Sequence, residues 1–288
     1  MSATGPRACA SLLALGLATA CPAPSDLPAP VVEAVDAPAP TPVNTPPRAA
    51  IDVCVGSEHS CAIRPDGRVY CWGDNLRHQV APEELAQTSV PMPVLGLPAA
   101  RRLVCSADES CVLSTADEVW CWGFTAGFAA PTRSPIRIPL SPGVRDFALT
   151  RWGGCAAFSD GKVRCYAAGS FSEVEAPGIA DATAFVPAEQ DRLCVARTAR
   201  PAICFTAAPR NAPKARADAS PPGPGEPIVF SRVEEVASPP TLPPAVAPPG
   251  TPRLAILRSS ADHACGLDVA GDVHCWGSAS AGQLGDRG

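Results

Sequence analysis

The sequence predicts an all-β protein assembled from repeated, disulfide-linked hairpins. Two cysteines separated by nine residues occur five times along the 288 residues, and a Trp-Gly step follows the second cysteine in three copies. The five pairs are Cys61/Cys71, Cys111/Cys121, Cys155/Cys165, Cys194/Cys204 and Cys265/Cys275. A motif that recurs every few tens of residues is the signature of a repeat architecture. We therefore expect one small antiparallel sheet around each pair.

The first copy contains a turn signal halfway between its cysteines. Pro65-Asp66-Gly67 combines a proline that presets φ with a glycine that takes the left-handed conformation at the end of the turn. A three-residue loop of this kind pairs Arg64 with Arg68 and, counting outward, Cys61 with Cys71. Cysteines paired at a non-hydrogen-bonded site lie about 4.5 Å apart at Cα, which a disulfide can span. The third and fifth copies also carry a turn glycine, whereas the fourth has none between its cysteines.

The cysteines have a rival interpretation as zinc ligands. Structural zinc ligands usually stand about two to four residues apart, and the gaps of nine residues do not match this spacing. An even set of cysteines in an exported chain favours disulfides. Two further cysteines, Cys54 and Cys105, occupy the same place on the strands that enter the first and second hairpins. They either bridge the first two repeats or pack as buried thiols.

Residues 1–20 resemble a signal peptide. Arg7 supplies a positive charge, and an apolar stretch of 13 residues that is too short to span a bilayer runs from Ala8 to Ala20. Ala18-Thr19-Ala20 offers a small-x-small cleavage site immediately before Cys21. A cysteine at the first mature position resembles the site of bacterial lipoproteins, so we expect either a lipid anchor on Cys21 or simple secretion.

The residues that flank the hairpins resemble a known repeat. Val55-Gly56-Ser57-Glu58-His59-Ser60 leads into the first pair, Trp72-Gly73-Asp74-Asn75 leads out of it, and the last copy ends with Gly282-Gln283-Leu284-Gly285. These features resemble the regulator of chromosome condensation repeat, in the cysteine-containing form of exported bacterial proteins. The resemblance covers most of residues 51–288 and implies a β-propeller with one four-stranded blade for each repeat. Five repeats are visible, and the third and fourth are degenerate, whereas propellers of this family usually have about seven blades.

Composition divides the chain into segments. Residues 21–50 form a Pro/Ala-rich, extended linker, and a second Pro-rich stretch at 207–252 separates the fourth and fifth repeats. We expect an exposed loop there, with a strand at 227–236. The fifth repeat stops at Gly288 without an outer strand, and a bare sheet edge is a liability. We expect residues 40–50 to complete the last blade; the alternative is a truncated gene product.

Charge disfavours nucleic acid as a partner. The net charge is −5, the isoelectric point is about 5.4, and no run of lysine or arginine is present. Binding to a phosphate backbone depends on a basic surface that releases counterions. The best-known members of the resembled family bind chromatin and act on a small GTPase, but no residues of this chain match those roles.

The residues that could carry chemistry have structural interpretations. His59 and His263 share one repeat position, and we expect them to form structural hydrogen bonds rather than a metal site. The acid pairs Glu83/Glu84, Glu173/Glu175 and Glu234/Glu235 fit solvated faces. No nucleophile elbow, phosphate loop or zinc motif occurs. The inner strands, such as Leu103-Val104 and Leu254–Leu257, look apolar. We expect no catalytic residue, no metal and no cofactor.

The tryptophans divide into two groups. Trp72, Trp122 and Trp276 follow the second cysteine of their hairpins, a repeated place where aromatic rings usually fill the core between blades. Trp120 and Trp152 are off this register, and we expect them to be exposed and available to an interface.

Three functions compete. The first is an exported, monomeric propeller, stabilised by disulfides, that binds a protein or a surface polymer outside the cytoplasm. The second is a structural lipoprotein of the cell envelope without a dedicated ligand. The third, an enzyme with its site in the axial channel, requires polar residues that converge at one end of the channel, and the sequence disfavours it.

Overall fold

The structure is a computed structural model of the chain, and it describes residues 49–81, 84–124, 131–150, 152–167, 171–186, 192–198, 200–210, 228–236 and 248–285. The predicted signal peptide at 1–20, Cys21 and the linker up to residue 48 lie outside these ranges. The same holds for residues 40–48 of the segment that the sequence predicts to complete the last blade. Residues 46–288 form one compact unit, and the description below concerns that unit.

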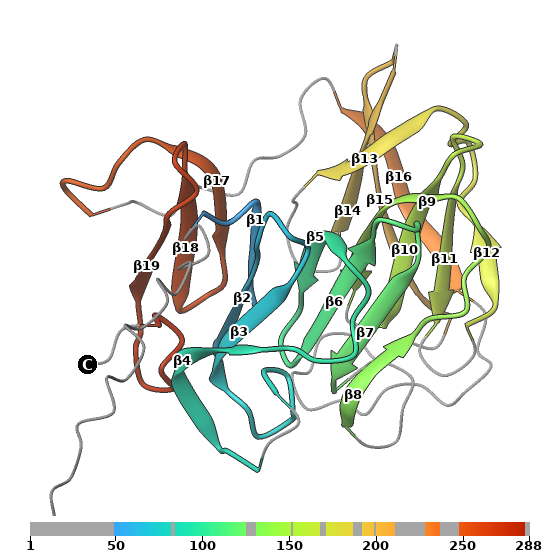
Figure 1. Ribbon diagram of the computed structural model, residues 1–288. Helices are drawn as coiled ribbons and strands as arrows, with labels where there is room; N and C mark the ends of the chain where they lie inside the picture. Colours follow the sequence, from blue (N-terminus) through green and yellow to red (C-terminus); the bar gives the residue numbers. More distant parts are fainter. Residues whose placement is uncertain are drawn as a thin grey trace, which may run out of the picture. The chain divides into compact units, whose positions relative to one another are not determined.

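Nineteen strands in the described residues form five antiparallel sheets (Figure 1). Blade 1 contains β1 (Asp52–Val55), β2 (His59–Ile63), β3 (Val69–Asp74) and β4 (Gln87–Pro93). Blade 2 contains β5 (Ala100–Cys105), β6 (Glu109–Ser114), β7 (Val119–Gly123) and β8 (Thr132–Arg137). Blade 3 contains β9 (Val144–Thr150), β10 (Gly153–Phe158), β11 (Val163–Ala167) and β12 (Glu173–Glu175). Blade 4 contains β13 (Ala182–Val186), β14 (Arg192–Arg197), β15 (Ala202–Pro209) and β16 (Ile228–Val236), and blade 5 contains β17 (Leu254–Ser259), β18 (His263–Asp268) and β19 (Val273–Gly277).

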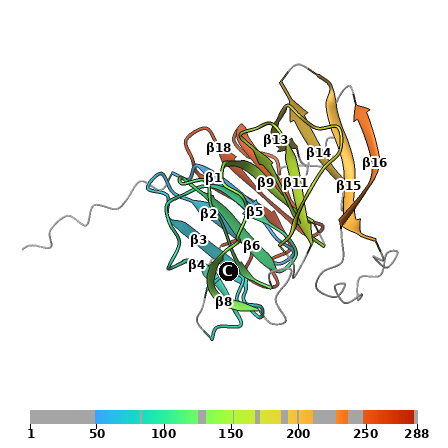
Figure 2. The same ribbon diagram turned by 90° about the vertical axis from the view of Figure 1, so that its right-hand side faces the viewer.

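Each blade is a meander in which every strand pairs with the next one along the chain. The first strands of neighbouring blades contact one another: β1 contacts β5 and β17, and β9 contacts β5 and β13. Figure 1 shows β17–β19 beside β1, so the last repeat packs against the first. Figure 2 shows blade 4 from the side, with β16 at the edge farthest from β13. The protein is a five-bladed β-propeller, which confirms the predicted fold class.

The hairpin of blade 1 has the register that its turn predicts. Arg64 N donates to Arg68 O at 2.9 Å, and Cys61 lies opposite Cys71. Gly67 closes the turn with a φ of 80°, in the left-handed region where a Cβ is disfavoured. Asp117 takes the same place in blade 2 with a φ of 62°, which an aspartate tolerates better than most residues.

The hairpin of blade 4 forms without a turn glycine. Cys194 still lies opposite Cys204. The buried side chain of Arg197 donates from Nε to Pro201 O at 2.7 Å, and it pairs with Glu235 on β16. A side chain therefore replaces the missing backbone signal and holds the turn against the outer strand.

Strand β16 lies inside the Pro-rich insertion, at the place where the sequence predicts a strand. It pairs with β15, which extends to Pro209 and so takes in the first residues of the insertion. Residues 211–227 and 237–247, where the sequence predicts exposed loop, lie outside the described residues.

The tryptophan predictions are confirmed in part. Trp72 and Trp122 are buried, whereas Trp276 is half-buried on β19, the outermost described strand of its blade. The prediction that Trp152 is exposed is wrong, because only 5% of this residue is accessible. Its backbone N donates to the side chain of Thr150 at 3.2 Å in the tight β9–β10 turn, and this turn carries the ring into the protein. Trp120, also predicted to be exposed, is half-buried against the core of blades 1 and 2.

Candidate functional site

The histidines of the repeat lie in the seams between blades. His59 Nε2 on β2 lies 2.8 Å from Ser110 Oγ on β6, and His263 Nε2 on β18 lies 2.9 Å from Ser60 Oγ on β2. Each imidazole therefore hydrogen-bonds a serine of the following blade. The seam between blades 5 and 1 repeats the seam between blades 1 and 2, and the prediction of structural hydrogen bonds for both histidines is confirmed.

A backbone carbonyl joins each of these seams from the other side. Gln79 O accepts hydrogen bonds from Trp122 Nε1 at 2.9 Å and from Ser110 Oγ at 3.2 Å. In the seam between blades 5 and 1, Gln283 O accepts from Trp72 Nε1 at 2.8 Å and from the equivalent serine at 3.1 Å. The loop that follows one hairpin is thereby fixed to the sheet of the next blade. Gln283 of the Gly-Gln-Leu-Gly ending therefore joins the end of the last repeat to blade 1.

Burial controls the charge of both histidines. Complete burial, and to a lesser extent the charge of His263, lowers the pKa of His59 to about 3. Burial also lowers the pKa of His263, so both rings are neutral near pH 7. His59 Nδ1 has no hydrogen-bond partner, which places the single ring proton on Nε2, where it is donated to Ser110 Oγ. The hydroxyl of Ser110 in turn donates a hydrogen bond to Gln79 O.

Six disulfides join the described cysteines. Five of them close hairpins with Cα separations of 3.9–4.1 Å: Cys61–Cys71, Cys111–Cys121, Cys155–Cys165, Cys194–Cys204 and Cys265–Cys275. The sixth, Cys54–Cys105, connects blade 1 to blade 2 with a Cα separation of 5.5 Å, within the range that a disulfide spans. The structure thus contains the bridge rather than two buried thiols.

The two cysteines of this bridge are not equivalent in their repeats, and that expectation is wrong. Cys54 lies opposite Cys61 in the β1–β2 pair, whereas Cys105 lies opposite Ser110 in the β5–β6 pair, one residue further along. Successive side chains of a strand point to opposite sides. The offset of one residue therefore lets the two cysteines face each other across the seam.

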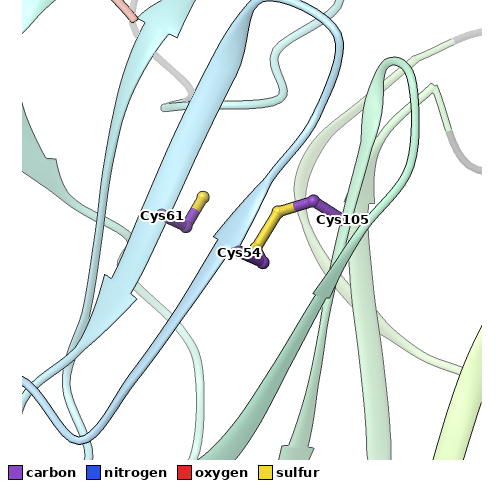
Figure 3. A group of neighbouring side chains, drawn as sticks. All are labelled: Cys54, Cys61 and Cys105. Atoms are coloured by element: carbon purple, nitrogen blue, oxygen red, sulfur yellow. A yellow bond between two sulfur atoms is a disulfide. The ribbon is translucent and has the colours of Figure 1, made fainter. Parts of the chain in front are cut away.

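Three sulfur atoms gather at this seam. The Sγ atoms of Cys54, Cys61 and Cys105 all lie within 4.8 Å of one another (Figure 3). Three thiolates at this spacing could bind a soft metal ion, but here every sulfur belongs to a disulfide. A second group, Glu109 with Cys111 and Cys121, also contains a closed disulfide. Both groups are disulfide surroundings in this structure.

The inner strands carry charged residues, which corrects the expectation that they are apolar. Asp52 on β1 is buried; its Oδ1 accepts from Val53 N at 2.9 Å and its Oδ2 accepts from Leu103 N of blade 2 at 2.8 Å. Asp146 on β9 repeats this arrangement with its own strand and with Phe185 N of blade 4 at 2.7 Å. Each carboxylate thus connects two successive blades.

Two arginines balance these carboxylates. Arg102 pairs with Asp146, and Arg258 Nη2 lies 3.7 Å from Asp52 Oδ1. Burial raises the pKa of Asp146 while Arg102 opposes that shift, and burial lowers the pKa of Arg258. Both aspartates are buried, and each of their carboxylate oxygens accepts a backbone N–H. The cluster is suited to holding blades together.

The acid pairs of the sequence form ion pairs at the blade edges. Glu84 pairs with Arg133 between blades 1 and 2, and Glu175 lies 2.8 Å from Lys162. Glu83 lies outside the described residues. Both described pairs are exposed, and exposed pairs contribute at most about 1 kcal/mol. The expectation of solvated faces is confirmed for these described residues.

A surface cavity of about 280 Å³ lies between the turn of the blade 2 hairpin and the segment that enters blade 3. Its carboxylates are Asp117 and Glu118. Arg101 pairs with Asp117 at 2.9 Å, and Arg137 pairs with Glu118 at 2.8 Å. Both carboxylates that line the cavity are therefore in ion pairs.

Hydrogen bonds of Asn75 connect the described residues of the loop between β3 and β4, which presents apolar side chains. Asn75 Oδ1 accepts from Val80 N and Ala81 N, both at 3.0 Å, and Asn75 Nδ2 donates to Leu85 O at 3.0 Å. Of the seven exposed large hydrophobic side chains in the described residues, four lie in this loop and the strand and connection that follow. They are Leu76 (71% exposed), Leu85 (45%), Val90 (40%) and Leu95 (66%). We call these four residues the blade-1 apolar surface.

Fold and site together define a disulfide-linked β-propeller whose polar repeat residues hold successive blades together. The family model of the Regulator of chromosome condensation (RCC1) repeat matches residues 50–79. Alsin of Rattus norvegicus is 35% identical over 82 residues, which cover 25% of this chain and 5% of alsin. The family match thus covers one repeat, formed by blade 1 up to β3 and part of the loop that follows it.

Solved structures similar to this chain include two structures of yeast Prp20 and one of a plant receptor ectodomain. Yeast RCC1 (Prp20) bound to Kap60 has 14% identity and a TM-score of 0.44, covering 80% of this chain and 56% of Prp20. Prp20p of Saccharomyces cerevisiae has 15% identity and a TM-score of 0.43, covering 82% and 60%. The ectodomain of the Arabidopsis thaliana receptor kinase ACR4 has 13% identity and a TM-score of 0.39, covering 80% and 84%.

This chain therefore spans little of alsin and a little over half of the yeast structures. Within the described ranges, the structure contains no helix with the length and apolar character needed to cross a membrane.

Proposed function

We propose that this protein is an exported, disulfide-stabilised propeller that binds another protein through the blade-1 apolar surface. The observation that carries the proposal is that four of the seven exposed large apolar side chains in the described residues belong to one blade, with Leu76 and Leu85 in the loop after β3, Val90 on β4 and Leu95 after β4. Single exposed apolar residues are ordinary, but several of them on one blade, two of them in one loop, favour an interaction site there.

The loop that carries Leu76 and Leu85 is organised before any partner binds. Gln79, itself buried, accepts from Arg77 N at 2.8 Å through Oε1 and donates through Nε2 to Asp74 Oδ2 at 2.6 Å. Its carbonyl is fixed to blade 2 as described above. A surface held in one conformation loses less entropy on binding than a mobile one. The same residue thus secures the blade seam and shapes the proposed contact surface.

Charged groups border this surface. The Arg77 guanidinium lies 5.1 Å from the centre of the Phe124 ring, and Glu84 pairs with Arg133. An apolar centre with a polar rim is the usual composition of a protein–protein interface. A protein partner fits this composition better than a charged polymer does.

We further propose that the protein acts outside the cytoplasm, as a lipoprotein or in secreted form. Six disulfides support an oxidising compartment. In this proposal residues 1–20 are removed, Cys21 carries the lipid, and residues 22–39 tether the propeller to the envelope. Residues 40–50 serve as the missing outer strand of the last blade.

Photo-crosslinking in the native envelope tests the binding surface. A photoreactive amino acid at position 76 is expected to trap a defined protein, and the Leu76→Ser/Leu85→Ser double variant is expected to lose capture when the probe sits at position 90. Val269, 80% exposed on the turn of blade 5, supplies the control, since Val269→Ser should leave capture unchanged. Equal trapping by the double variant, or no trapped protein at all, contradicts the proposal.

The second candidate, a structural envelope lipoprotein without a ligand, predicts an intact anchor with no trapped partner. The enzyme candidate has little support, because Asp52 and Asp146 are committed to backbone amides of two blades each.

A further inference from the structure

We propose that the Cys54–Cys105 bridge is a redox-active site whose reduction by an external dithiol starts an exchange with the neighbouring Cys61–Cys71 disulfide. The inference goes beyond the proposed binding function, and it rests on the three sulfur atoms that meet between blades 1 and 2. Among the described residues, Cys54–Cys105 is the only disulfide that connects two blades.

The site offers Cys54 a choice of two partners. Its sulfur is bonded to Cys105 of blade 2, and Cys61 lies directly opposite it in the β1–β2 register. All three sulfurs lie within 4.8 Å of one another (Figure 3). Thiol–disulfide exchange proceeds by attack of a thiolate on a neighbouring disulfide sulfur. A thiolate at Cys54 therefore has a second disulfide within reach, without a large movement of the chain.

The Ser110 hydroxyl lies close to two of these three sulfur atoms. Ser110 Oγ lies 3.6 Å from Cys61 Sγ and 3.8 Å from Cys105 Sγ. In the oxidised protein the Ser110 hydroxyl donates its hydrogen bond to Gln79 O, the contact already described between blades 1 and 2. After reduction, rotation of the hydroxyl allows it to donate to the sulfur released at Cys105, and a hydrogen bond to a charged acceptor is stronger than one to a neutral group.

Access and connectivity single out this bridge for attack. Cys105 is half-buried, whereas Cys54, Cys61 and Cys71 are buried. In a hairpin disulfide, both cysteines are held opposite each other by the paired strands of one sheet, so a reduced pair closes again and expels the reductant. Cys54 and Cys105 belong to different sheets. Their separation after reduction needs only an opening of the seam.

The chemical steps balance with a dithiol reductant. One reductant thiolate attacks Cys105 Sγ, the bond to Cys54 breaks, and Cys54 leaves as a thiolate. The second reductant thiol then closes the reductant to its own disulfide and releases Cys105 as a thiol. Cys54 attacks Cys61 Sγ, the Cys61–Cys71 bond breaks, and Cys71 takes up a proton. The reductant is oxidised by two electrons, and the protein retains one disulfide at the site, Cys54–Cys61.

Titration of the native protein with dithiothreitol, followed by alkylation and peptide mapping, tests the first step. Cys105 is expected to become labelled at about tenfold lower dithiothreitol than Cys265 and Cys275, together with Cys54 before the exchange or Cys71 after it. The Cys265–Cys275 pair is a matched control, because Cys275 is also half-buried but belongs to a hairpin disulfide. Simultaneous labelling of Cys105 and this control pair, or earlier labelling of Cys265 and Cys275, overturns the proposal.

The exchange step is tested with one cysteine removed. Cys105→Ser leaves a thiol at Cys54 beside the Cys61–Cys71 disulfide, and we expect alkylation of Cys71 as well as Cys54, together with a peptide linked through Cys54 and Cys61. In the control Cys275→Ser, Cys265 keeps a free thiol. Among the described residues, Cys265 belongs to no group of three sulfur atoms like the one between blades 1 and 2. Only Cys265 should be labelled there.

Alkylation confined to Cys54 in the Cys105→Ser protein refutes the exchange. Should that variant fail to fold, the dithiothreitol titration of the wild-type protein still decides, because the same map reports a Cys54–Cys61 peptide at partial reduction. Its absence when Cys105 is fully labelled also refutes the exchange.

Discussion

Replacing His59 by glutamine is expected to flatten the acid side of the protein's stability profile. Burial holds the pKa of His59 at about 3, against 6.5 for an exposed histidine. A histidine with a lowered pKa in the folded state contributes stability that is complete above about pH 6.5. That contribution is lost as the pH falls toward 3, because the unfolded chain binds the proton more tightly.

The magnitude follows from the two pKa values. Each pH unit between them costs about 1.36 kcal/mol, so acidification from pH 7.5 to pH 5 is expected to remove about 2 kcal/mol through His59 alone. This window lies above the ordinary pKa values of the carboxylates. The lowered pKa of His263 acts in the same direction and is present in both the wild type and the variant.

Urea unfolding with intact disulfides at pH 7.5 and pH 5 measures the effect. His59→Gln keeps a donor for Ser110 Oγ but has no titrating group, so its loss of stability on acidification should be about 2 kcal/mol smaller than that of the wild type. His78→Asn is the control, since His78 has a φ of 58° that asparagine also adopts. Parallel pH profiles for the wild type and His59→Gln would refute the argument.

Three other perturbations test separate parts of the structure. Asp52→Ala leaves Val53 N and Leu103 N without acceptors and should cost about 2–4 kcal/mol in urea unfolding; a loss below about 0.5 kcal/mol contradicts the role of Asp52 as a link between blades. Trp122→Phe removes the donor to Gln79 O, and the expected cost is about 1–3 kcal/mol; an unchanged urea midpoint contradicts it. Cys21→Ser should abolish incorporation of labelled fatty acid and release the protein from membranes, and retained label disproves lipidation at this position.

The hairpins could be predicted because their information is local. The turn at Pro65–Gly67 and the two cysteines of the first pair lie within one short segment, so backbone preference fixes the register before any other blade is considered. Blade 4 shows the limit of that reasoning. Its turn depends on Arg197 and its contact with Glu235 of β16, which is distant in the sequence.

The contacts between blades were predicted less well than the hairpins. The recurring positions of His59 and His263 indicated a structural role, but their partners belong to the following blade. Asp52 and Asp146 were missed although both stand at one repeat position on an inner strand; an acid directly before apolar strand residues in two repeats was the available signal. The exposure of Trp152 was predicted wrongly, because burial depends on the path of the β9–β10 turn.

The amino-acid sequence by itself determined the repeat, the antiparallel strand pairs and the disulfide within each hairpin, since those features arise from residues close together in the chain. Only the tertiary structure decided that Cys54 meets Cys105, that charged side chains bridge the inner strands, and that four large apolar side chains of blade 1 are exposed. The physical reason is that the disulfide and the contacts of the charged side chains join segments at least about 40 residues apart in the sequence, and the packing of successive sheets sets their distances.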